Sequence, residues 1–159
     1  MRHRLSCVAL VVLSLGAARA ASPAEISAFV IGGEPGETWK RGYGGMLTIT
    51  LFNIVSGEIE GAWQDGELEG TSIGTVAAKA YVGPSIGRLV PYLGLGAGAY
   101  RESLPTKTDQ GTSGLLFAGA KLKFPFGLVV RAEYQWMTLP EDVSVPLDNR
   151  YLFAAGLSF

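Results

Sequence analysis

The sequence predicts an all-β fold in which eight antiparallel strands follow one another and close into an up-and-down barrel. Three observations support this prediction. Apolar residues alternate with small or polar ones in segment after segment, and a period of two is the period of a strand. Glycine, a poor helix former, occurs 22 times among 159 residues. Short and long connections alternate along the chain, as expected when antiparallel neighbours are joined in succession.

The alternation defines eight segments, of which the first has no clear inward or outward face. The expected strands are 25–33, 43–53, 58–64, 75–82, 92–101, 114–124, 128–138 and 149–159. The last segment shows the pattern most clearly, because its apolar side chains all share one face. At about ten residues it is long enough to cross a bilayer at a tilt.

Residues 1–20 are interpreted as a secretory signal peptide. A basic start is followed by a short apolar run and by the A-x-A cleavage pattern of residues 18–20. The single Cys and the single His of the chain, Cys7 and His3, both lie in this segment. The expected domain is therefore a barrel at 21–159, with no disulfide framework, no cysteine-based metal site and no cofactor. Its formal charge is about −4.

Alternation alone leaves two barrels open, a soluble lipocalin-like one with an apolar interior and a membrane one with an apolar exterior. The distribution of aromatic residues favours the membrane barrel. If the chain starts in the periplasm, one girdle lies at the long-loop end and the other at the short-turn end. The first girdle is Tyr43, Trp63, Trp136 and Tyr151, and the second is Phe124 and Phe159. Short turns at one end and long polar loops at the other agree with this choice.

The second face of the strands carries charges of both signs, which the membrane barrel places in its lumen. Eight strands leave a lumen that side chains fill, and charges there must be paired. The expected luminal network is Glu58, Glu60, Lys79, Lys121, Lys123, Arg131, Glu133 and Arg150.

Several of these segments resemble a known family. The Gly-rich strand 92–98 and the pair 119–124 and 128–134 are similar to strands of the eight-stranded opacity-protein and outer-membrane-protein-A type barrels. The resemblance implies insertion into the outer membrane and no periplasmic domain after the barrel. It also implies a C-terminal signal for the barrel-assembly machinery, formed by Tyr151, Phe153, Leu157 and Phe159.

The residues do not predict a catalytic site. Small outer-membrane barrels that modify lipids, as the resemblance implies, use a His beside a Ser or another partner, and residues 21–159 contain no His. A Ser activated by Lys121 or Lys123 remains open, as do general acid–base pairs such as Glu58 with Glu60. Residues 94–99 fit a loose G-x-G-x-x-A pattern, but no helix follows to bind a dinucleotide.

The long loops carry an excess of acidic residues. The set is Glu34, Glu37, Asp65, Glu67, Glu69, Glu102, Asp109, Glu141, Asp142 and Asp148 against Lys40, Arg41, Arg101 and Lys107. Solvation or binding of divalent cations is open for this set, whereas nucleic-acid binding is not expected. The expected function is a non-enzymatic, monomeric outer-membrane protein in contact with lipids and lipopolysaccharide, with an envelope-structural or surface-interaction role. A lipid-modifying enzyme and a narrow pore are the alternatives.

Overall fold

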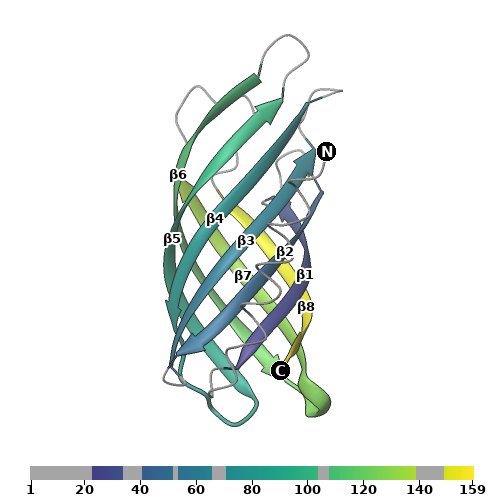
Figure 1. Ribbon diagram of the computed structural model, residues 1–159, viewed down its shortest axis with the longest axis vertical. Helices are drawn as coiled ribbons and strands as arrows, with labels where there is room; N and C mark the ends of the chain where they lie inside the picture. The colour runs from purple at the N-terminus through teal and green to yellow at the C-terminus, as the bar shows by residue number, and fades with distance from the viewer. Residues whose placement is uncertain (1–22, 34–40, 52–53, 66–70, 104–107, 139–148) are drawn as a thin grey trace, which may run out of the picture.

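The computed structural model describes residues 23–33, 41–51, 54–65, 71–103, 108–138 and 149–159. They form a closed barrel of eight antiparallel strands in chain order (Figure 1), which confirms the predicted fold class. The strands are β1 (Ala24–Gly33), β2 (Gly42–Leu51), β3 (Val55–Asp65), β4 (Ser72–Val82), β5 (Leu89–Ser103), β6 (Thr108–Lys123), β7 (Leu128–Thr138) and β8 (Asn149–Ser158). The expected signal peptide at 1–20 lies outside the described residues. Within the described part of the chain, no helix is long and apolar enough to cross a membrane.

The first and last strands close the barrel. β1 pairs with β2 on one side and with β8 on the other, with Ala28 opposite Ala155. The backbones of Ala24 and Phe159 exchange two hydrogen bonds of 3.0 and 2.9 Å. The described strands therefore leave no edge unpaired, and every strand is protected from pairing with another chain.

The barrel is apolar outside and charged inside. Leu95 and Val76 on the outer surface are 67% and 61% exposed, whereas Arg131 and Glu60 inside are each 1% exposed. A water-soluble protein does not leave a continuous apolar band uncovered. The exterior is therefore the lipid-facing surface of a transmembrane barrel, as the girdle pattern predicted.

The two ends of the barrel differ. The turns 83–88 and 124–127, the facing ends of β2 and β3 at Leu51 and Val55, and the C-terminus lie at one end, at the bottom of Figure 1, which we call the inner end. The opposite end is called the outer end. β5 and β6 are longer than the other strands, and their hairpin projects beyond its neighbours at the outer end (Figure 1). In outer-membrane barrels the short turns face the periplasm.

The prediction of a loop between residues 102 and 112 is wrong, because most of this segment is strand. β5 continues to Ser103 and β6 begins at Thr108, and these two residues face each other. Alternation of apolar residues fades there, but the backbone ladder does not depend on it. A hairpin that projects into water keeps its backbone hydrogen bonds even where the side chains on both faces are polar. For the same reason β4 begins earlier than predicted, at Ser72. β3 also begins earlier, at Val55, because the inward–outward alternation of its side chains continues through the residues expected to form a turn.

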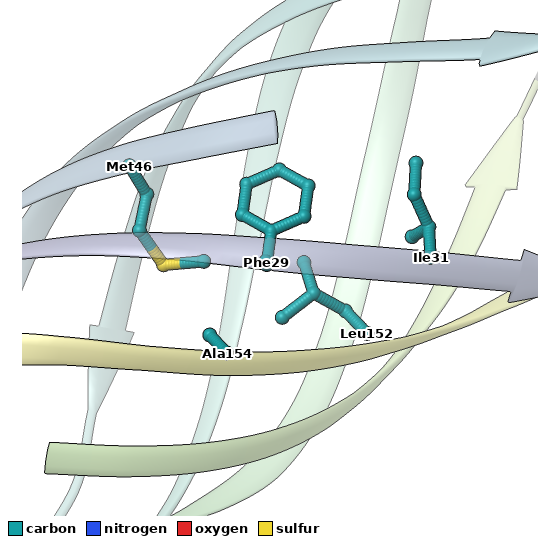
Figure 2. Packing of buried hydrophobic residues seen from close by; sticks show 5 residues of the cluster. All are labelled: Phe29, Ile31, Met46, Leu152 and Ala154. Atoms are coloured by element: carbon teal, nitrogen blue, oxygen red, sulfur yellow. The ribbon is translucent and has the colours of Figure 1, made fainter. Parts of the chain in front are cut away.

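The barrel interior also contains two apolar clusters. The first lies between β1, β2 and β8 and consists of Phe29, Ile31, Met46, Leu152 and Ala154 (Figure 2). The second consists of Tyr81, Tyr92, Leu115, Phe117 and Met137.

Glycines make room for the rings of these clusters. A Cβ placed on Gly44 would lie 2.3 Å from the Phe29 ring, and one on Gly94 would lie 2.4 Å from the Phe117 ring. At Gly44 and Gly94, therefore, a ring from another strand lies against the backbone.

Candidate functional site in the barrel lumen

Lys79 of β4 is at the centre of the charged interior. Its Nζ lies 2.8 Å from Glu58 Oε1, 2.8 Å from Glu60 Oε2 and 2.7 Å from Glu133 Oε1. Glu58 and Glu60 are both on β3, two residues apart, so they share the inward face. Glu133 reaches Lys79 from β7, on the other side of the lumen. One ammonium group, with three donors, thus binds carboxylates from two walls of the barrel.

Arg131 of β7 contacts two of the carboxylates that bind Lys79. Its guanidinium forms ion pairs with Glu58 and Glu133, and its Nη2 donates to Glu58 Oε1 at 3.1 Å. Its Nε donates to the Tyr92 hydroxyl at 2.5 Å, and that hydroxyl donates to Glu133 Oε2 at 2.9 Å. The Arg131 guanidinium also lies 4.8 Å from the centroid of the Tyr92 ring, a cation–π distance.

Arg150 of β8 completes the network. It forms an ion pair with Glu60 and donates to the Gln135 side-chain oxygen. The Gln135 amide donates in turn to Glu60 Oε2 at 3.0 Å and to Glu133. We call the residues of these contacts the central network: Glu58, Glu60, Lys79, Arg131, Glu133, Arg150, Tyr92 and Gln135. The central network contains three carboxylates and three cations, so its charges balance.

A second, smaller ion pair lies nearer the inner end. Lys121 Nζ is 2.8 Å from Glu25 Oε2, and Ser27 donates to the other Glu25 oxygen at 3.1 Å. Lys123, the last of the eight residues assigned to the lumen, is half-buried at the inner mouth. It makes no ion pair within the described part of the chain. It lines a polar pocket of about 20 Å³ together with Lys121 and Glu25, a volume that holds about one water molecule.

Sequence reasoning missed three participants in these contacts. Gln135 has the same parity as Arg131 and Glu133, so its inward position could be predicted. Its hydrogen bonds to the charged residues could not. Tyr92 has the same parity as Gly94, Gly96 and Gly98 in the Gly-rich strand, and its sequence position would fit a girdle residue equally well. Glu25 was missed because the first strand has no clear facing in the sequence. Its inward position follows only from the pairing of β1 with β8.

Aromatic side chains gather at both ends of the outer surface. At the outer end Tyr43 is 67% exposed and faces Trp63 across the β2–β3 ladder. Tyr134 contacts both Trp136 and Tyr151, with ring centroids 4.6 and 4.8 Å apart. At the inner end Phe124 and Phe159 are exposed. Tyr134 joins the expected outer girdle, and exposed Phe126 in the β6–β7 turn joins the inner one.

Glu102 does not belong with the solvated acidic residues of the loops. It lies on β5, its side chain is 1% exposed, and its Oε1 has no hydrogen-bond partner. Asp109 faces it from β6. Because β5 extends through Glu102, this side chain points inward at the outer end of the lumen. The sequence did not indicate this, because a loop was expected at this position. Most of the other acidic loop positions, and with them Lys40 and Lys107, lie outside the described residues.

The ion pairs in the lumen occupy Lys121 and the charged residues of the central network, which leaves these groups little scope for acid–base or nucleophilic chemistry. A Ser–Lys pair was left open for Lys121 or Lys123. The structure places the Glu25 carboxylate between Lys121 and Ser27, whereas Lys123 lies half-buried at the inner mouth beside the pocket that Ser56, Ser85 and Ser158 also line. An ion-paired ammonium is not free to deprotonate a hydroxyl. The described residues include no group of three or more His, Cys, Asp or Glu placed to hold a metal ion. The glycine pattern at 94–99 lies inside β5, where the chain continues as strand to Ser103.

Comparison with solved structures identifies the fold. The N-terminal β-barrel domain of OprF from Pseudomonas aeruginosa matches with a TM-score of 0.67 and 17% identity, over 87% of this chain and 100% of that chain. This chain has the fold of an eight-stranded outer-membrane β-barrel. Neisserial surface protein A (NspA) matches with a TM-score of 0.62 and 11% identity, over 86% of this chain and 95% of that one.

Ail of Yersinia pestis, solved in a phospholipid bilayer nanodisc, is similar as well. Its TM-score is 0.60 and its identity 19%, over 87% of this chain and 100% of that chain. No protein-family model and no curated protein sequence matches this barrel. The likeness is therefore one of fold, and the function has to be argued from the barrel itself.

Proposed function

We propose that this protein is a non-enzymatic, integral outer-membrane barrel whose role is structural for the cell envelope. The observation that carries the proposal is the central network, which fills the middle of the lumen with mutually paired side chains. A barrel built in this way has no open passage and no free nucleophile among the network residues. Its function then lies in its surfaces, toward lipid and toward the medium.

The filled lumen argues against the pore alternative. Six ionised side chains and two polar ones cross the lumen at the level of Lys79. An eight-stranded barrel has space for little more than such side chains. We expect planar-bilayer recordings of the refolded protein to show no conductance steps above baseline. Reproducible steps would contradict a closed lumen and restore the pore.

The same contacts argue against a lipid-modifying enzyme. Residues 21–159 contain no His, and Lys121 is held by Glu25 at 2.8 Å. Liposomes of phospholipid and lipid A, incubated with the refolded protein, are expected to keep an unchanged acyl composition by mass spectrometry. A protein-dependent loss or transfer of acyl chains would overturn the non-enzymatic proposal.

The proposed location is the outer membrane, reached through cleavage after residue 20. The partners are outer-membrane lipids, lipopolysaccharide and the barrel-assembly machinery, which would recognise the C-terminal strand. Phe153, Leu157 and Phe159 support the last point, since all three are exposed on the lipid-facing side of β8. Fractionation of expressing cells is expected to place the protein in the outer membrane, in a form that shifts on gels after boiling. A purely soluble periplasmic pool would rule this out.

A second candidate is contact with other surfaces through the outer loops. Two observations favour it, the projecting β5–β6 hairpin (Figure 1) and the acidic composition of the loop sequences. One barrel of this fold, Ail, is the attachment invasion locus protein of Yersinia pestis. If this candidate holds, adhesion of expressing cells to a surface will fall when the hairpin is shortened to the level of its neighbours. Unchanged adhesion would remove it.

A further inference from the structure

A hollow of about 870 Å³ lies in the barrel wall near the outer end and extends across β2 to β6. Four strands line it with three consecutive residues each: 61–63, 74–76, 99–101 and 110–112. In a strand the first and third residue of such a triplet share a face. Here that face is the lipid-facing one, since Trp63, Val76, Ala99 and Arg101 are all exposed. The hollow is therefore a groove in the outer surface, separate from the lumen.

Missing side chains create this groove. Across the strands, one row at the level of the outer girdle runs Tyr43, Trp63, Gly74, Arg101 and Gln110. Gly74 leaves a gap in this row between Trp63 and Arg101. The Trp63 ring leans over the gap, because a Cβ on Gly74 would lie 3.3 Å from two of its ring carbons.

The floor of the groove continues toward the membrane centre with short side chains. The next row has Gly61 opposite Val76 and Val76 opposite Ala99. A Cβ on Gly61 would meet nothing within 4 Å, so this part of the wall is open. The floor of the groove is therefore apolar and has few side chains to fill it.

Its outer rim is cationic. Arg101 is exposed on the lipid-facing side of β5, with Gln110 directly opposite on β6. A guanidinium offers a planar fork of donors that fits a phosphate, and an amide side chain adds another donor. A phosphate-sized anion at the level of the aromatic girdle and a hydrocarbon chain below it would match the rim and the floor together.

We propose that this groove binds a phosphorylated, multiply acylated glycolipid of the lipid A type, with a phosphate at Arg101 and an acyl chain along Gly61, Val76 and Ala99. The inference rests on the proposed outer-membrane location, which places the outer end of the barrel in the external, lipopolysaccharide-bearing leaflet. Three features together fit this ligand class: the depth of the groove in the membrane, the charge at its rim and the Trp63 ring, on which a sugar can stack. Its volume falls in the range of about 300–1,000 Å³ of ordinary ligand pockets.

Native mass spectrometry of the folded protein in detergent micelles, titrated with diphosphorylated lipid A, tests the proposal. Arg101→Gln removes the charge and Gly61→Leu fills the floor without a clash. Arg101→Gln is expected to weaken lipid A retention about tenfold, the effect of losing one good charge-assisted contact. Gly61→Leu is expected to weaken it as well, because the Leu side chain takes the space of the acyl chain. Arg88→Gln, an exposed arginine of the β4–β5 turn at the inner end, is the charge control. Gly57→Leu is the steric control, since Gly57 lies on the same face of β3 and a Cβ there also meets nothing within 4 Å.

The proposal is overturned if the two groove variants lose no more lipid A than their controls. It is also overturned if phosphatidylglycerol, titrated in parallel, is retained as tightly and with the same dependence on Arg101, because the site would then be a general anionic-lipid surface. The heat-dependent gel shift confirms that each variant is folded. Liposome permeability and acyl composition are measured on the same samples. A leak or lipid hydrolysis would contradict the proposed function, whereas loss of selectivity alone would contradict only this inference.

Discussion

Lys79 connects the β3 and β7 walls of the lumen, and its three carboxylate contacts explain why this position carries a cation. Taking charges out of water is costly, and in the barrel interior the cost is offset only when every charge has close partners. Lys79, Arg131 and Arg150 balance Glu58, Glu60 and Glu133 one for one. Removing one member leaves an excess charge of the opposite sign with no water to solvate it.

Replacing Lys79 with Met is therefore expected to destabilise the barrel by about 3–5 kcal/mol, the usual cost of breaking a buried ion network from one side. Urea-induced unfolding of the refolded protein in detergent micelles measures this change. Lys123→Met is the matched control, because Lys123 is half-buried at the inner mouth and is expected to cost far less. Equal losses in the two variants would show that the central network contributes no special stability.

Gly94 is an uncharged luminal residue whose replacement is also expected to affect folding. Its backbone lies under the Phe117 ring, so the methyl groups of a Gly94→Val variant have no space and the ring has to move. We expect most of this variant to remain unfolded on refolding, as judged by the heat-dependent gel shift. Gly57→Val on the open lipid-facing surface should refold like the parent protein. A normal yield for Gly94→Val would mean that the second apolar cluster repacks easily.

Among the elements, β8 closes the barrel, because it pairs with the first strand, β1, as well as with its chain neighbour β7. The final residue takes part directly, since Phe159 exchanges two backbone hydrogen bonds with Ala24. Without this ladder the barrel would keep two open edges. The β5–β6 hairpin is different, because its outer part projects beyond its neighbours and closes nothing.

Deleting Phe159 is accordingly expected to reduce the fraction of heat-modifiable, folded protein in the outer membrane severely. Removing two residues from the connection 104–107 should leave that fraction nearly unchanged. Both variants can be compared by quantitative gel analysis of membrane fractions at equal expression. If both deletions were tolerated alike, the C-terminal strand would have no special part in closure or assembly.

At the level of the whole molecule, the barrel reverses the usual order of a globular protein. Large apolar side chains such as Leu95, Ile59 and Phe153 are more than half exposed, whereas charged ones such as Lys79 and Arg131 are buried. Folding therefore depends on a surrounding apolar phase, because exposing the apolar outer surface to water is unfavourable.

We expect the protein to refold in detergent or lipid and to aggregate in buffer alone. Far-UV circular dichroism together with size-exclusion chromatography distinguishes the two results. A monodisperse, folded monomer in detergent-free buffer would be incompatible with a lipid-facing exterior.

Depth in the membrane gives a finer test of the same surface. Ile59 lies near the middle of β3, and a lysine there should cost about 2–4 kcal/mol, whereas near an interface it costs about 0–1 kcal/mol. Thr138, exposed at the outer end of β7, is the matched position for the interface. Unfolding titrations of Ile59→Lys and Thr138→Lys in lipid vesicles measure the difference. Similar values for the two would place Ile59 outside the hydrocarbon layer.

The sequence by itself determined the strands and, in all but the first, their two faces. Alternation is a local property, so the inward position of Arg131 and Glu133 and the exposed position of Trp63 could be predicted from neighbouring residues. The fold class followed, because eight such segments with a charged face and two aromatic girdles have few other solutions. The strand ends at Ser72 and Ser103 could not be predicted, because polar hairpin backbone pairs without a side-chain pattern.

Only the tertiary structure decided which inward residues meet. Lys121 and Glu25 are 96 residues apart in sequence and Lys79 and Glu133 are 54 apart, and nothing in either segment indicates its partner. These contacts depend on closure of the barrel and on the stagger of its strands, which bring distant segments to the same level. The same closure turned Glu25 inward, set Phe117 against Gly94 and opened the groove beside Trp63. The physical reason is that a strand has two faces by local geometry, whereas its neighbours across the lumen are chosen by the whole barrel.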